Sequence, residues 1–243
     1  MSRVLLPKGI LFDLDDTILS AYGRPDVAWG KVADEFSARI APIAPAELAA
    51  RITVEARAFW DDAARHKEWR AKLDDARREI VARAFAKIGS PAASTRELEH
   101  AIADRFTRLR DEEMAVFPGA YETLDDLKTR GVRLALITNG AGDAQRGKIA
   151  RFALEHRFDH IQIEGEHGFG KPEERAYLHA LGALSLDARD VWMVGDNLEW
   201  EVAAPQRLGI FAIWHDAYGQ GLPAGGTIKP DRIIKRLPEL LGR

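Results

Sequence analysis

Gly-Ile-Leu-Phe-Asp-Leu-Asp-Asp-Thr, residues 9–17, is the stretch that decides the fold. Its apolar segment predicts a short buried strand that runs directly into acidic residues. Asp13 and Asp15 are two positions apart, so in an extended chain they project to the same side, about 6.6 Å apart. Parallel strands of an open α/β sheet present functional residues at their carboxyl ends, so the pattern indicates a metal or phosphoryl-transfer site. Acids that cap a turn are the alternative.

Composition excludes several classes of protein. With 243 residues, 46% of them hydrophobic and 30% charged, the chain is typical of a globular protein with one sizeable core and a smaller satellite. A formal charge of -3 argues against a nucleic-acid polymer as partner, and the absence of cysteine excludes thiolate metal sites and cysteine nucleophiles. Apolar segments are too short for a signal peptide or a membrane span. We therefore expect a cytoplasmic protein without a membrane partner; the sequence does not indicate its oligomeric state.

Two kinds of sequence follow the first strand. Residues 20–114 show helix-like apolar spacing, interrupted so as to form about four helices, with Ser94 or Thr95 as the amino-terminal cap of the last. After Pro118 the pattern alternates between helices and strands. Strands are predicted at 132–137, 160–163, 191–194 and 210–213, and helices up to 130, at 143–156, from 172, and at 198–208.

This alternation predicts an α/β fold with a doubly wound, mostly parallel sheet. The first strand must join that sheet, because a lone strand cannot bury both of its faces. We therefore expect a core formed by residues 1–19 and 115–243, with a small all-helical domain at 20–114 inserted after the first strand.

Later strands also end in polar residues. Thr138, Asn139 and Gly140 offer a hydroxyl, an amide and a free backbone N–H near a helix start, which suits a phosphate oxygen. Lys171 precedes a predicted helix, where the helix dipole is unfavourable for a cation unless an anion or carboxylates lie nearby. Asp196 follows another buried strand. Taken alone, the Thr138 segment has a capping role as its alternative, and Lys171 has that of a solvated surface lysine.

Taken in order, these motifs identify a family resemblance. The predicted strand ends carry, in this order, Asp-x-Asp, Thr-Asn, Lys and Gly-Asp. With this order the chain resembles, over nearly its whole length, the phosphatase branch of the haloacid dehalogenase-like (HAD) hydrolase superfamily. The helical insertion stands in the position of that family's small cap domain. The resemblance implies a Rossmann-like core. It also implies a role for each matching residue: nucleophile for Asp13, general acid and base for Asp15, phosphoryl binding for Thr138, contact with nucleophile and phosphate for Lys171, and metal ligation for Asp196.

One position departs from the family pattern. The second acid, usually Asp, that commonly follows the one matching Asp196 is here Glu201, which leaves direct metal ligation by this residue in doubt. Asp16 and Thr17 are assigned to turn structure.

The implied chemistry is consistent with the residue types. The ionised Asp13 carboxylate can attack phosphorus and form an aspartyl phosphate, while Asp15 moves protons. Mg²⁺ prefers oxygen ligands and would be held by Asp13, the Asp15 backbone carbonyl and Asp196. We therefore expect a magnesium-dependent phosphomonoester hydrolase for a small phosphorylated metabolite. A phosphomutase and a non-catalytic phosphate-binding module are the alternatives.

A second motif favours a different function. Residues 142–148 fit the beginning of a Gly-x-x-x-x-Gly-Lys phosphate loop, which would indicate a nucleoside-triphosphatase. However, Ile149 stands where that mechanism needs a Ser or Thr hydroxyl for magnesium. We therefore interpret the segment as a surface helix that contains Gln145 and Arg146 and is capped by Asp143.

Substrate selectivity is expected in the helical insertion, where the sequence says less. Phe59, Trp60, His66, Trp69 and Arg70 form an aromatic and basic cluster. Trp60 and Trp69 would lie on opposite faces of any continuous helix, so they cannot both line one pocket there.

Overall fold

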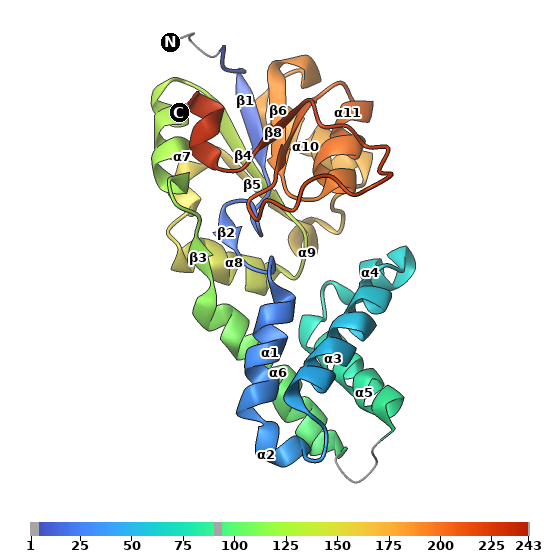
Figure 1. Cartoon of the computed structure of the whole chain (residues 1–243). Coiled ribbons are helices and arrows are strands. Elements are labelled where there is room, and N and C mark those ends of the chain that lie inside the picture. The colour runs from blue at the N-terminus through green and yellow to red at the C-terminus, as the bar shows by residue number, and fades with distance from the viewer. Residues whose placement is uncertain (1–4, 90–93, 243) are drawn as a thin grey trace. The chain divides into compact units, whose positions relative to one another are not determined.

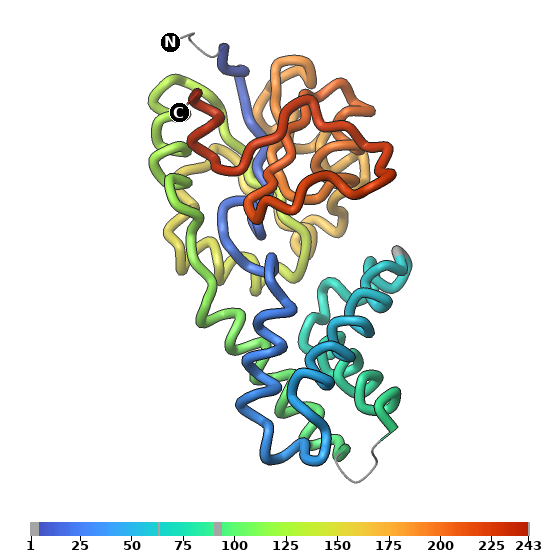
Figure 2. The backbone as a smooth tube through the Cα atoms, in the orientation of Figure 1, coloured from blue at the N-terminus to red at the C-terminus, as the bar shows by residue number. Residues whose placement is uncertain are grey.

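The chain forms two compact units in a computed structural model that describes residues 5–89 and 94–242. One unit combines Met1–Ser20 with Ala115–Arg243, and the other is Ala21–Met114. Figure 2 shows the chain path: the backbone leaves the first unit early, runs through the helical unit, and returns for the rest of the sequence. Assignment of these units as catalytic core and cap stays a prediction.

A six-stranded parallel sheet forms the centre of the larger unit (Figure 1). Its strands are β1 (Gly9–Phe12), β4 (Arg133–Thr138), β5 (His160–Ile163), β6 (Val191–Gly195), β7 (Phe211–His215) and β8 (Arg232–Ile234), in the order β5-β4-β1-β6-β7-β8. The predicted α/β fold with a parallel sheet is confirmed, and β1 joins it between β4 and β6. The edge strand β8 was missed, because three residues carry too little periodic signal.

Helices cover both faces of this sheet. They are α7 (Ala120–Thr129), α8 (Gly142–Arg151), α9 (Glu164–His167), α10 (Glu174–Leu184), α11 (Ala204–Arg207), the short 3-10 helices η2 (Glu155–Arg157), η3 (Ala188–Asp190) and η5 (Leu237–Leu241), and the π-helix η4 (Leu198–Ala203). Leu11 on β1 packs with Tyr177 and Leu181 of α10, whereas the opposite-facing Phe12 contacts the Phe158 ring edge-on. The complete burial of β1 thus explains its unbroken apolar sequence.

Several helix boundaries differ from the sequence prediction. The helix predicted at 143–156 starts at Gly142 and ends at Arg151, and Asp143 lies inside its first turn rather than capping it. The helix predicted from 172 begins at Glu174. The one predicted at 198–208 is a π-helix followed by a single α-turn.

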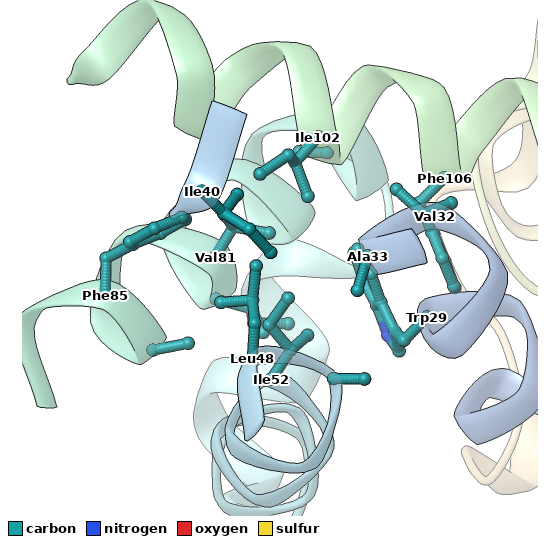
Figure 3. Packing of buried hydrophobic residues seen from close by; sticks show 14 of the residues in the cluster. Trp29, Val32, Ala33, Ile40, Leu48, Ile52, Val81, Phe85, Ile102 and Phe106 are labelled. Carbon is teal, nitrogen blue, oxygen red and sulfur yellow. The ribbon is translucent and has the colours of Figure 1, made fainter. Parts of the chain in front are cut away.

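Six helices make up the described part of the smaller unit, not about four. They are α1 (Pro25–Glu35), α2 (Ser37–Ile40), α3 (Pro45–Trp60), α4 (Ala63–Trp69), α5 (Leu73–Ile88) and α6 (Arg96–Glu113). Figure 3 shows side chains from α1, α2, α3, α5 and α6 meeting in one apolar core. In this core Trp29 stacks on Phe106 with ring centroids 3.6 Å apart. Thr95 caps α6 by accepting a hydrogen bond from the Leu98 N–H, which confirms one of the two predicted caps.

The two tryptophans singled out from the sequence lie on different helices. Trp60 ends α3 and Trp69 ends α4, so the continuous-helix geometry assumed for them does not apply. Both rings contact the buried Phe59 ring edge-on. Packing around Phe59 therefore accounts for part of the aromatic cluster.

Two short strands join the segments where the chain leaves and re-enters the larger unit. β2 (Leu19–Ser20) and β3 (Ala115–Val116) pair antiparallel.

Within the described ranges, every helix is too short or too polar to cross a membrane.

Candidate active site

The predicted functional residues meet at the carboxyl edge of the sheet. β1 lies between β4 and β6 in parallel register, with Phe12 opposite Leu136 and Val194. Asp13 continues β1 by donating its N–H to the Val194 carbonyl at 2.9 Å. Thr138 ends β4 and Asp196 follows β6, so the parallel register brings these strand ends side by side.

Lys171 lies between two carboxylates. Its Nζ is 2.5 Å from Asp13 Oδ1 and 2.7 Å from Glu201 Oε1, and the Lys171 and Glu201 side chains are each 1% exposed. These carboxylates explain why a lysine is tolerated before a helix. The second oxygen of Glu201 accepts the Asn197 N–H at 2.7 Å. Both oxygens of Glu201 are therefore bound by groups of the protein itself.

Gly195 makes room for this arrangement. A Cβ added there would lie 2.0 Å from Glu201 Cγ, far inside any real contact. The close approach of Glu201 to the backbone thus explains the glycine at the end of β6.

Charge is unbalanced at this edge of the sheet. Burial raises the pKa of Asp13 even though Lys171 opposes the shift, and burial raises the pKa of Glu201 to about 7 against the same opposition. For Lys171, burial favours the neutral amine, but Asp13 and Glu201 outweigh it and raise the pKa. The pKa of Asp196 is raised first by desolvation and then by the charges of Glu201 and Asp13. The Asp196 side chain nevertheless reaches solvent. Burial, more than neighbouring charge, therefore disfavours the ionised carboxylates, and a bound cation would offset that penalty.

Asn139 holds the main chain of Lys171. Its Nδ2 donates to the Lys171 carbonyl at 2.7 Å, and its Oδ1 accepts the Lys171 N–H at 2.9 Å. In this structure the side-chain amide of Asn139 is hydrogen-bonded to the Lys171 main chain. Phosphate binding by Asn139 stays a prediction. The Gly140 N–H expected to be free instead donates to Glu164 Oε2 at 3.1 Å.

Two site residues were misread from the sequence. Lys148 of α8, interpreted as part of a surface helix, lies with its Nζ 2.8 Å from both oxygens of Asp15. Gln145, one turn earlier, is 3% exposed and donates its Nε2 to Asp15 Oδ2 at 3.1 Å and to Thr138 Oγ1. The i, i+3 spacing of the two residues was the available signal, because it places both on one face of a helix.

Residues assigned to the turn after β1 also contact the site. Thr17 donates its hydroxyl to Asp13 Oδ2 at 3.2 Å. Asp16 adopts a left-handed backbone with φ 56°, and its carboxylate accepts the Tyr218 hydroxyl at 2.9 Å. His215 Nδ1 lies 3.2 Å from the Asp16 carbonyl, so C-terminal residues support the turn. Tyr218 and His215 lie about 200 positions from Asp16, too far along the chain for any sequence pattern to connect them.

The donors present fit a hard cation that completes its shell from other sources. Asp13 and Asp196 supply carboxylates, and the Asp15 backbone supplies a carbonyl, all of them oxygen donors. Among the residues described, no three Asp, Glu or His side chains form a full metal-binding group by themselves. Mg²⁺ is usually held by one or two protein carboxylates, with water and substrate phosphate providing the remaining ligands.

A parallel α/β sheet with acids, a buried lysine and a threonine at its carboxyl edge is the arrangement that the order of the sequence motifs led us to expect. Residues 7–209 match the family model of the haloacid dehalogenase-like hydrolases. The chain belongs to this family, which confirms the resemblance identified from its motifs.

Curated relatives with a named activity match part of the chain. A phosphoserine phosphatase from Thermus thermophilus is 34% identical over 159 residues, which are 65% of this chain and 62% of that protein. A glyceraldehyde 3-phosphate phosphatase from Pyrococcus furiosus is 32% identical over 139 residues, 56% of this chain and 55% of that protein. The chain thus spans less than two thirds of the length of these curated relatives.

A solved structure supports the fold over the full length. A magnesium-bound protein from Bacillus subtilis, assigned to the HAD hydrolases, superposes with a TM-score of 0.71 at 19% identity, covering 97% of each chain. At this identity the likeness establishes the fold, including a helical insertion after the first strand.

Proposed function

We propose that this protein is a magnesium-dependent phosphomonoesterase that acts on a small phosphorylated metabolite through an aspartyl phosphate. The observation that carries the proposal is the buried contact between Asp13 and Lys171, 2.5 Å long, at a strand end that also holds Asp15. A carboxylate at the end of a strand, bound by a lysine and next to a second acid, provides the groups needed for covalent phosphoryl transfer.

Asp13 is the nucleophile in this proposal. One of its oxygens attacks phosphorus as the bond to the leaving oxygen breaks, which gives an acyl phosphate and an alcohol. The Thr17 hydroxyl and the Lys171 ammonium each bind one oxygen of Asp13, so the carboxylate has a defined orientation. Lys171 also brings positive charge to where the anionic phosphoryl group would lie.

Asp15 moves the proton in both halves of the reaction. In its protonated form it gives its proton to the leaving alkoxide, and the resulting carboxylate then takes a proton from the water that attacks the acyl phosphate, which restores the acid. Its position two residues after Asp13 supports this role, since both side chains follow the same strand. Thr138, at the end of β4, would bind the phosphoryl group through its hydroxyl.

Mg²⁺ bound at Asp13, Asp196 and the Asp15 carbonyl would neutralise phosphate charge and reduce its repulsion of the attacking carboxylate. The raised pKa values of Asp13 and Asp196 support a cation at this position, because burial and neighbouring carboxylates already disfavour their charges.

The substrate class follows from the relatives' names. The curated relatives include phosphatases of phosphoserine, glyceraldehyde 3-phosphate and N-acylneuraminate 9-phosphate, all small phosphorylated metabolites. Their diversity supports the class without selecting one member.

The test is phosphate release from a broad metabolite panel and from 4-nitrophenyl phosphate, with and without excess EDTA. We expect turnover by the wild type that EDTA abolishes and added Mg²⁺ restores, and loss of turnover by at least about 10⁴-fold in Asp13→Asn. Wild-type inactivity on the whole panel would refute the proposal. Full activity of Asp13→Asn would refute Asp13 as nucleophile, and transfer of phosphate within a sugar phosphate, without release, would favour the phosphomutase alternative.

A further inference from the structure

The family motifs leave one contact of the site unexplained. Lys148 approaches both oxygens of Asp15 at 2.8 Å, and the two side chains are only 14% and 19% exposed. Gln145 adds a third hydrogen bond to the same carboxylate at 3.1 Å. Both residues lie in the Gly-x-x-x-x-Gly-Lys segment, which is helical from Gly142 onward and does not form a phosphate loop.

Asp15 needs such partners because of its neighbours. It lies after the end of β1, where it forms an isolated β-bridge with Leu19, and close to Asp13, whose charge it disfavours. Repulsion between carboxylates would drive the Asp15 side chain toward solvent, away from the reacting phosphate. An ammonium group bound to both of its oxygens opposes that movement and also orients the carboxylate plane.

Gln145 couples this orientation to the phosphate site. Its Nε2 carries two hydrogens and donates to both Asp15 and the Thr138 hydroxyl. Because Gln145 is buried, its amide has few other orientations available. The proton-transfer group and the expected phosphoryl-binding hydroxyl are therefore held by one side chain.

We propose that Lys148, together with Gln145, is a positioning residue that holds the Asp15 carboxylate in line with the leaving oxygen. The inference rests on the proposed phosphatase function and adds residues to which the family motifs assign no role. Lys148 acts through Asp15, so its removal should matter most for substrates whose leaving group needs a proton.

The test compares two leaving groups. 4-Nitrophenolate leaves without a proton, whereas a primary alkoxide needs one, and kcat/KM reports only the steps up to transfer of phosphate to Asp13. We expect Lys148→Met to lower kcat/KM for the alkyl phosphate about 10- to 100-fold more than for 4-nitrophenyl phosphate. This is less than the roughly 10²- to 10⁴-fold contribution of general acid catalysis, because Asp15 itself is still present. Lys148→Arg should restore most of the difference, since a guanidinium can also bind both oxygens.

The matched control is Lys128→Met. Lys128 forms a more exposed ion pair with Asp159 at 3.1 Å in the same unit, and its substitution should leave the ratio between the two substrates unchanged. Thermal unfolding of each variant identifies any loss of fold. Crystal structures give a second readout: the Asp15 side chain should turn away in Lys148→Met and keep its orientation in Lys148→Arg.

Equal losses on both substrates, or none, in a folded Lys148→Met variant would overturn the inference and leave the phosphatase proposal intact. An unmoved Asp15 in the Lys148→Met crystal structure would also overturn it. Absence of wild-type turnover on every substrate would instead overturn the proposed function, and this inference with it.

Discussion

Lys171 and Glu201 form an ion pair of 2.7 Å in which each side chain is only 1% exposed. Removal of Glu201 would leave the buried Lys171 ammonium with one carboxylate in place of two, that of Asp13 at 2.5 Å, and would remove the acceptor of the Asn197 N–H. Glu201 also accepts the Asn197 N–H, so it connects Lys171 to the start of η4. Its role in this structure is that of a counter-ion for the lysine.

Substitutions of Glu201 should therefore separate charge from hydrogen bonding. We expect Glu201→Ala to lower the free energy of unfolding by about 1–3 kcal/mol, because Lys171 keeps Asp13 as a counter-ion while the hydrogen bonds made by Glu201 are lost. Glu201→Gln should cost less than half as much, because an amide oxygen can still accept a hydrogen bond. Urea unfolding in EDTA measures both values, and equal losses would contradict this account.

Replacement of Gly195 should damage the site without changing any functional group. The Cβ of Gly195→Ala would collide with Glu201 Cγ, so Glu201 must move away from Lys171. We expect kcat to fall at least about tenfold and stability to fall by about 1–3 kcal/mol, as in other overpacked sites. Assays of phosphate release and urea unfolding check the two effects.

Gly182→Ala is the matched control for that variant. Gly182 lies in α10 with no atom within 4 Å of an added Cβ. Alanine should stabilise this helix by about 0.5–1 kcal/mol and leave activity unchanged. If both glycine variants behaved alike, the collision with Glu201 would not be the cause.

Asn139 should act through the Lys171 main chain. Asn139→Leu keeps a similar size but removes two hydrogen bonds of 2.7 and 2.9 Å. At about 1 kcal/mol each, their loss should lower kcat/KM about tenfold or more by letting Lys171 shift. The control is Gln206→Leu. It also removes two hydrogen bonds of 3.0 Å, but these are made by α11, far along the chain, so the variant should keep full activity. Unchanged kcat/KM in Asn139→Leu would show that Lys171 is held by its ion pairs alone.

Stability should depend on pH through His160. Burial, and then the neighbouring His179 ring 5.4 Å away, lower the pKa of His160 below its ordinary 6.5. The unfolded chain therefore binds a proton more readily, so this contribution to stability is complete above pH 6.5 and is lost as pH falls through the lower folded pKa. The melting temperature should fall between pH 7.5 and pH 5, and His160→Gln should reduce that fall.

His156→Gln serves as the control for the histidine prediction, because His156 is an exposed residue of η2. It should leave the pH dependence of the melting temperature as in the wild type. An unchanged slope in His160→Gln would contradict the assignment to His160.

Elements with strong local signals were predictable from sequence. The apolar run before Asp13 and the alternation after Pro118 indicated the parallel sheet, because strands buried on both faces are continuously apolar. Boundaries were less accurate: α8 ends at Arg151, five residues early, and the helix after β6 is a π-helix. Helix ends depend on capping and packing partners that a local pattern does not contain.

By itself, the sequence determined the fold class, the family and the placing of Asp13, Asp15, Thr138 and Asp196 at strand ends, because these depend on apolar periodicity and on the order of short motifs. Lys171 was also expected at a strand end, but α9 separates it from β5, which ends at Ile163. Only the tertiary structure decided the partners of those residues. It pairs Glu201 with Lys171, and it turns Lys148 and Gln145 from an expected surface helix onto Asp15. Such contacts depend on which helix face meets which strand end, and ion pairs between residues 30 to 133 positions apart leave no periodic trace in a single sequence.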